Sequence, residues 1–107
     1  MLNNPEDFNR ILNESNAVLA YFSGESCNIC KVLRPNVESM LRENFPEMVF
    51  LYVDVNIFPE IAAQQSVFTI PTVICFFEGK EFFRKSRAFG ISELAGEIKR
   101  PYNLLFV

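Results

Sequence analysis

The sequence predicts a single α/β domain over residues 1–107, and three observations support this. Two runs of strand length, the continuously apolar residues 17–22 and the largely apolar residues 48–55, lie on either side of a stretch with helical periodicity. A strand, a helix and a strand in that order form a parallel pair joined by a right-handed crossover. Residues 73–77 and 81–85 then predict a hairpin around a Glu-Gly-Lys turn, which adds antiparallel strands.

The first expected element is a helix over residues 5–14. Asn4 can cap it, Pro5 suits its first turn, and two acidic residues follow at the positive end of the helix dipole. Apolar residues at helical spacing give it one buried face: Phe8, Ile11 and Leu12. The apolar runs at 17–22 and 48–55 do not alternate with polar residues, so both are expected to be buried strands.

The second helix is expected to begin near Cys27, and Pro35 within it should kink it. Its charged residues, Lys31, Arg34 and Glu43, are interpreted as a solvated face. A short third helix is expected over residues 59–65, because a Pro-Glu pair opens it.

A last helix is expected to start at Ser92, and Pro101 should disturb or end it. The chain after Pro101 is apolar for a tail, so residues 102–107 are expected to fold back onto the core. If exposed instead, this tail would be a dimer or partner-docking patch.

Composition excludes several classes of function. Half of the residues are apolar and 21% are charged, which is typical of one globular core. The net charge of −3 argues against nucleic acid and anionic membranes as partners. No apolar stretch approaches the about 20 residues of a membrane-spanning helix. The polar first fifteen residues do not resemble a secretory signal, so a cytoplasmic location is expected.

The chain contains no histidine, which excludes Ser-His-Asp and Cys-His catalysis and His-ligated metals. A zinc site needs about four ligands, and two nearby thiols leave it short. We therefore expect no metal within one chain, although two chains sharing a metal or cluster through four thiols is an open alternative.

Cys27-Asn28-Ile29-Cys30 is the motif that carries chemistry. Two thiols at this spacing can form and break a disulfide with little backbone movement. A thiol at a helix N-terminus lies near unpaired N–H groups and the positive dipole end, which favour the thiolate, so Cys27 is the expected nucleophile. The third cysteine, Cys75, lies within an apolar strand and is expected to be inert and buried.

These motifs and their order resemble the thioredoxin family over residues 5–100. The resemblance rests on the dithiol after a buried strand, a proline in the helix that follows, an Ile-Pro-Thr before the hairpin and the hairpin turn itself. It implies a thioredoxin-like fold with a central four-stranded mixed sheet flanked by helices, in which the family's N-terminal strand is absent or minimal.

The resemblance also implies how the site works. Cys27 would attack a substrate disulfide, and Cys30 would then attack Cys27 and release the reduced substrate. Pro71 is expected to follow a cis peptide bond, so that Thr69, Ile70 and Pro71 align an extended substrate beside Cys27. No bound cofactor is required, since the redox-active disulfide does the chemistry. An external reductant, such as a thioredoxin reductase or a thiol pool, would regenerate the dithiol.

Some positions depart from the family pattern around the dithiol. Ser23 and Ser26 stand where the family typically carries Trp. Asn28 and Ile29 replace Gly-Pro between the cysteines, and this dipeptide tunes the reduction potential.

Three further departures concern proton transfer and substrate binding. Tyr21 stands at the position of the family's buried acid, and Tyr52 at that of its lysine partner. We expect them either to be core tyrosines with satisfied hydroxyls or to face each other behind Cys30 as a weaker substitute, and favour the former. Arg87 stands where the family typically carries Gly, and its guanidinium can favour an acidic or glutathione-like partner or point to water. The Gly-Gly loop that binds glutathione in glutaredoxins is not present.

The leading interpretation is a thiol–disulfide oxidoreductase that reduces or exchanges disulfides of protein substrates and contributes to cell redox homeostasis. The alternative is a catalytically weak interaction module dedicated to one partner, which the departures favour and the intact dithiol opposes. We expect a monomer or a weak dimer.

Overall fold

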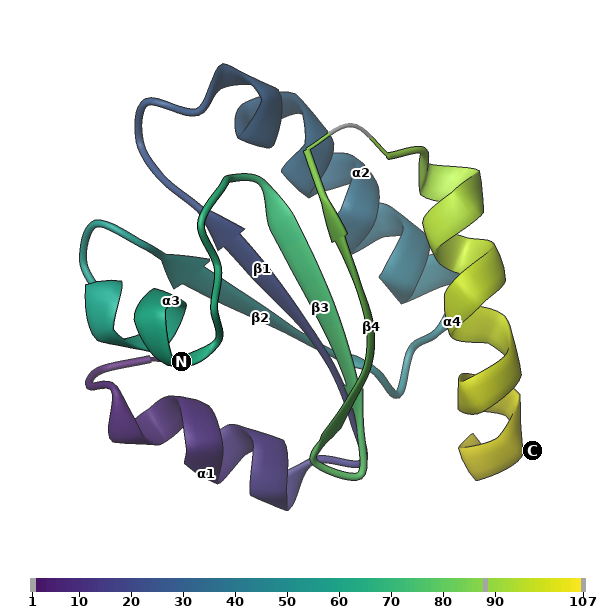
Figure 1. The fold of residues 1–107 in the computed structure, drawn as a ribbon. Helices are drawn as coiled ribbons and strands as arrows, with labels where there is room; N and C mark the ends of the chain where they lie inside the picture. Colours follow the sequence, from purple (N-terminus) through teal and green to yellow (C-terminus); the bar gives the residue numbers. More distant parts are fainter. Residues whose placement is uncertain (1, 88, 107) are drawn as a thin grey trace.

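The computed structural model describes residues 2–87 and 89–106. Helices and strands alternate through most of this range (Figure 1). In chain order the elements are α1 (Glu6–Glu14), β1 (Ala17–Ser23), α2 (Asn28–Asn44), β2 (Val49–Asp54), α3 (Pro59–Gln64), β3 (Thr72–Phe77), β4 (Lys80–Ser86) and α4 (Ile91–Phe106).

The strands of the described residues form one sheet of four strands in the order β2-β1-β3-β4. β1 is parallel to β2 and antiparallel to β3, and β3 and β4 are the two arms of the predicted hairpin. The expected four-stranded mixed sheet flanked by helices is therefore confirmed. Within the described range, α1 is the first element and no strand precedes it.

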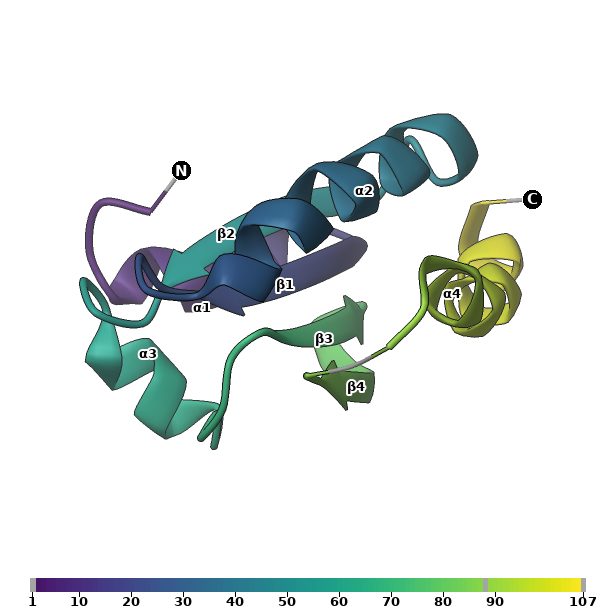
Figure 2. The same cartoon turned by 90° about the horizontal axis from the view of Figure 1, so that it is seen from above.

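Each face of the sheet carries its own apolar core. On one face, Phe8 of α1 lies between Phe22 and Phe76, with ring centroids 6.1 and 6.0 Å away, and Ile61 of α3 joins the same core. On the other face, α2 and α4 pack against the sheet and against each other. Figures 1 and 2 show these two helical layers on opposite sides of the strands. Every residue of β1 is buried, as predicted for a strand covered on both faces.

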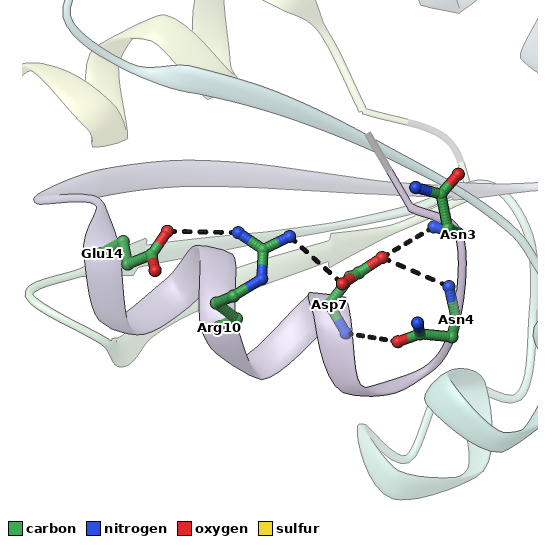
Figure 3. Close-up of polar contacts among 5 residues, drawn as sticks. All are labelled: Asn3, Asn4, Asp7, Arg10 and Glu14. Atoms are coloured by element: carbon green, nitrogen blue, oxygen red, sulfur yellow. Dashed lines mark hydrogen bonds and ion pairs between the residues drawn. The ribbon is translucent and has the colours of Figure 1, made fainter.

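The start of α1 has the predicted cap (Figure 3). The side-chain oxygen of Asn4 accepts a hydrogen bond from the N–H of Asp7 at 3.2 Å. The Asp7 carboxylate accepts from the N–H groups of Asn3 and Asn4, and it pairs with Arg10 at 3.1 Å. The Asn3 N–H bond is the main cause that lowers the pKa of Asp7 below its usual value. The stabilisation of α1 by this carboxylate is therefore present at neutral pH and is lost as the pH falls through that lowered pKa.

The hairpin turn adopts the backbone that its sequence suits. Glu78 and Gly79 both have positive φ angles, of 54° and 79°. Two such residues between antiparallel strands match a type I′ turn, which follows the right-handed twist of the strands.

The prediction that residues 48–55 are a fully buried strand was wrong. β2 is an edge strand, and its burial alternates from Phe50 onward, with Leu51 and Val53 buried and their neighbours in the strand only partly buried. Leu51 and Val53 belong to the core beneath α1 and α3. Phe50 and Tyr52 point to the opposite face and are only partly buried, because an edge strand has a covering neighbour on one side only.

Of the two predicted effects of Pro101, ending the last helix was wrong, because α4 continues through it to Phe106, and a local disturbance there stays a prediction. A proline within a helix costs about 3 kcal/mol. Packing after it offsets that cost: the Tyr102 ring lies 4.9 Å from the Phe45 ring, and its hydroxyl accepts a hydrogen bond from the N–H of Glu47. The tail therefore does fold back onto the core as far as Phe106, and Val107 lies outside the described residues.

α2 likewise continues through Pro35 as one helix, and a kink there stays a prediction. In the described residues, no helix is both long enough and apolar enough to cross a membrane.

Tyr102→Ala tests whether packing maintains α4 beyond Pro101. We expect it to lower the free energy of unfolding by about 3 kcal/mol, because it removes a buried ring and the hydroxyl partner of Glu47. Leu104, which is 79% exposed in the same turn, is the matched control, and Leu104→Ala should cost less than about 0.5 kcal/mol. Urea denaturation measures both. Equal effects would show that the packing of Tyr102 does not hold this turn in place.

Candidate active site

The dithiol lies where β1 gives way to α2. Cys27 is the N-cap of α2 and Cys30 lies in its first turn, and the two form a disulfide with their Cα atoms 5.3 Å apart. The Cys27 N–H donates to the carbonyl of Gly24 at 3.1 Å, which fixes the loop that leads into the helix. Cys27 is 9% exposed and Cys30 is 3% exposed, so the Cys27 sulfur is the more accessible of the two.

The cap position has a chemical consequence. The Cys27 sulfur accepts a hydrogen bond from the backbone N–H of Cys30 at 3.2 Å. This is the bond that a side-chain oxygen usually makes at an N-cap, and it satisfies one of the helix's unpaired N–H groups. Together with the helix dipole it stabilises negative charge on Cys27 when the disulfide is opened.

The segment containing the cis proline lies beside the dithiol. The Ile70–Pro71 peptide bond is cis, as predicted. The side chain of Ile70 packs against the core cluster that contains both Cys27 and Cys30. Gly24 lies close to it as well: a Cβ there would come within 3.3 Å of Ile70 Cδ1 and 3.0 Å of Asn56 Nδ2, so this loop position has little room for a side chain.

Two hydrogen bonds hold this segment. The Thr72 hydroxyl donates to the carbonyl of Thr69 at 2.7 Å, across the cis bond. The Arg87 N–H donates to the carbonyl of Pro71 at 2.8 Å. These bonds bring together the four residues that the sequence predicted for substrate binding: Thr69, Ile70, Pro71 and Arg87. Their roles in substrate binding stay predictions.

Arg87 has a left-handed backbone, with φ of 62°, and an exposed side chain. A position with this backbone favours glycine, which agrees with the Gly that the family typically carries there. The guanidinium is therefore presented to solvent from a strained position next to Pro71.

Tyr21 and Tyr52 are neighbours, as the sequence count indicated. They pair in register on the parallel strands β1 and β2, and their rings stack with centroids 6.3 Å apart. The Tyr21 hydroxyl donates to the backbone carbonyl of Cys30 at 3.2 Å, so the description as a core tyrosine with a satisfied hydroxyl fits Tyr21, whereas Tyr52 is only partly buried on the edge strand. Burial is the main cause that raises the pKa of Tyr21 to about 12, so this phenol stays protonated at physiological pH.

Arg34 is the residue near the site that sequence reasoning missed. Its side chain is 41% exposed, as its assignment to the solvated face of α2 predicts, and its guanidinium carbon also lies 3.9 Å from the centroid of the Tyr52 ring. The available signal was its position four residues after Cys30, which places both on the same side of the helix.

Exposed apolar side chains lie on α2 next to the cysteines and in the loop before Pro71. Ile29 and Val32 are exposed on the first turns of α2, and Phe68, two residues before Ile70, is 89% exposed. Ile29 and Val32 also line a shallow pocket with Asn28. Among the described residues, no cluster of three or more histidine, cysteine or acidic side chains is arranged to hold a metal.

Comparisons with known proteins agree with this geometry. The family model for thioredoxin matches residues 1–100. The thioredoxin-like protein YdfQ of Bacillus subtilis is 31% identical over 84 residues, which cover 78% of this chain and 74% of that protein. The thioredoxin of Chlamydia trachomatis is 43% identical over 70 residues, which cover 65% of this chain and 68% of that protein. The X-ray structure of Fasciola hepatica thioredoxin superposes with a TM-score of 0.80 at 33% identity, over 89% of this chain and 91% of that one.

Selective alkylation tests the prediction that Cys75 takes no part in the chemistry. Cys75 is completely buried on β3, and burial raises the pKa of its thiol well above the usual value. In reduced native protein, we expect iodoacetamide to modify Cys27 first and to leave Cys75 unmodified, as measured by mass spectrometry of peptides. In denaturant, all three cysteines should react. Modification of Cys75 in the native protein at a rate near that of Cys27 would contradict its assignment as an inert core residue.

Proposed function

The chain belongs to the thioredoxin family and is a thiol–disulfide oxidoreductase, and we propose that its substrates are disulfides of other proteins. The observation that carries this proposal is the Cys27–Cys30 pair at the N-terminus of α2, next to the cis Ile70–Pro71 segment. A reactive sulfur and a backbone that an extended chain can pair with are the two components that a protein disulfide reductase needs.

The proposed reaction has two exchange steps. The Cys27 thiolate attacks a substrate disulfide, so a Cys27–substrate bond forms and the first substrate sulfur leaves with the electron pair and takes up a proton. The Cys30 sulfur, as thiolate, then attacks Cys27, so the Cys27–Cys30 bond forms and the second substrate sulfur leaves. The substrate is reduced by two electrons and the dithiol is oxidised. A thiol-based donor, either a thioredoxin reductase or a small-molecule thiol pool, returns the two electrons.

Ile70 supports recognition of an extended substrate. Among the described residues, no hydrogen bond engages its N–H or its C=O. These two groups are therefore available to pair with a substrate strand, in the manner of strand addition to a sheet. The exposed side chains of Ile29, Val32 and Phe68 favour apolar residues around the substrate disulfide.

The second candidate function is a partner-specific interaction module. The apolar rim formed by Ile29, Val32 and Phe68 favours it, because such a surface can bind one partner without turnover. It predicts binding that survives replacement of both cysteines, whereas the reductase predicts activity that requires them. The cytoplasmic location and the single-domain organisation stay predictions.

Insulin reduction in the presence of dithiothreitol tests the reductase. We expect the wild-type protein to accelerate it and Cys27→Ser to return the rate to background, because the attacking sulfur is lost. Cys30→Ser should instead accumulate a mixed disulfide between Cys27 and the substrate, detectable by mass spectrometry. Cys75→Ser is the matched control and should retain activity, since Cys75 lies buried in β3. Background rates with the wild-type protein would leave the interaction module as the better assignment.

Arg87→Gln tests whether the exposed guanidinium of Arg87 gives the protein a preference for acidic partners. The substitution removes the charge and keeps a side chain of similar length at the exposed position beside Pro71. Loss of one exposed ion pair is worth at most about 1 kcal/mol, which is about fivefold in kcat/KM. We expect such a loss for a disulfide peptide with acidic flanking residues and none for its neutral counterpart, with the difference shrinking at high salt. Equal effects on both peptides would rule out charge recognition.

A further inference from the structure

The side chain of Tyr21 links the sheet to the helix turn that carries Cys30. Tyr21 is fully buried in β1, with Tyr52 of β2 and Val73 of β3 as its register partners. Its hydroxyl crosses to α2 and donates to the Cys30 carbonyl at 3.2 Å. A buried phenol needs a hydrogen-bond partner, and this one takes its partner from the backbone of the resolving cysteine.

A weak point of the helix begins at the residue after Cys30. In an α-helix each carbonyl accepts from the N–H four residues later, so the Lys31 carbonyl would require the N–H of residue 35. Residue 35 is proline and has none, so the helix loses one bond directly after Cys30. The bond from Tyr21 therefore ties the first turn of α2 to β1 one residue before the carbonyl that has no helical N–H partner.

A second contact between helix and sheet lies one turn further along. The guanidinium of Arg34 lies 3.9 Å from the Tyr52 ring centroid, and the Tyr52 ring stacks on Tyr21 with an angle of 20° between the planes. Arg34 also pairs with Glu38 at 3.5 Å, which keeps it along the helix. The two contacts hold α2 on the tyrosine pair over the turn that precedes Pro35.

We propose that Tyr21 is a positioning residue for the resolving step: its hydrogen bond holds the turn carrying Cys30 in the geometry from which Cys30 attacks Cys27. This inference rests on the proposed two-step reaction. The role of Tyr21 is geometric. Its hydroxyl is bonded to a carbonyl oxygen, and the proton that leaves the Cys30 thiol passes to water, while the departing substrate thiolate takes one up from water.

The charged and titratable groups around Tyr21 agree with a geometric role. Those facing it are Tyr52 on β2 and Arg34 on α2. Cys75 of β3 lies in the same core, and the negative charge of Glu97 on α4 contributes to raising the pKa of its thiol. Burial raises the pKa of the Tyr21 phenol to about 12 and that of the Cys75 thiol well above its usual value, so neither group ionises between pH 6 and 9. Within that range the rate of resolution should follow ionisation of the thiol itself.

The test separates the two exchange steps with a coloured disulfide, 5,5′-dithiobis(2-nitrobenzoate), used as the limiting reagent with fully reduced protein. Attack by Cys27 releases one nitrothiobenzoate, and resolution by Cys30 releases a second. Cys30→Ser, which should show only the first phase, assigns the phases. Stopped-flow absorbance measures both rates between pH 6 and 9.

Tyr21→Phe removes only the hydroxyl. We expect the second phase to slow by about fivefold, as loss of one net hydrogen bond predicts, with the first phase unchanged and the shape of the pH profile retained. Tyr102→Phe is the matched control, because it also removes a hydroxyl bonded to backbone, at the other end of α2, and should leave both phases unchanged. Arg34→Met should slow the second phase in the same direction, while Arg42→Met on the same helix should not.

An unchanged second phase in Tyr21→Phe would overturn the inference, as would equal slowing of both phases or an altered pH profile. These outcomes leave the proposed function intact as long as the wild-type protein shows two phases and reduces insulin. A wild-type protein with no first phase would instead refute the proposed reaction, and the inference with it. Two normal phases without insulin reduction would refute only the proposal that the substrates are disulfides of proteins.

Discussion

Burial of β1 on both faces is the constraint on which the rest of the structure depends. All seven of its residues are buried, so a helical layer must cover each side of the sheet. The strand lies between β2 and β3, and its end therefore fixes where the chain leaves the sheet. α2 begins four residues after Gly24, against the same core, and that start places Cys27 at the cap. The reactive sulfur is thus positioned by a strand that does not itself contain it.

Much of the fold was predictable because it is encoded locally. The cap at Asn4, the turn at Glu78-Gly79 and the dithiol at a helix start each depend on a few adjacent residues. The edge position of β2 was not predictable, because an apolar run does not reveal how many neighbours a strand has. Continuation of α4 through Pro101 was missed for a related reason. It depends on Tyr102 meeting Phe45, which lies 57 positions away in the sequence.

The site likewise contains features that the local sequence predicts and features that depend on distant contacts. Cys27, Cys30 and the cis bond before Pro71 follow from motifs, and counting along the chain was enough to pair Tyr21 with Tyr52. The direction of the Tyr21 hydroxyl was beyond the sequence, because it depends on where α2 crosses the sheet. The contact of Arg34 with Tyr52 was missed for that reason: helical periodicity shows which residues share a side, but not which aromatic ring that side meets.

Complete burial of Cys75 also bears on how the protein acquires its disulfide. Three thiols allow three different pairings in an unfolded chain, and two of them would link β3 to the start of α2. Once the sheet has formed, Cys75 faces Leu19 in the core and cannot be reached by either partner or by an oxidant. Oxidation after folding therefore has a single product, whereas oxidation before folding has three, two of which join the buried Cys75 to the start of α2. The order of the two events decides the yield of active protein.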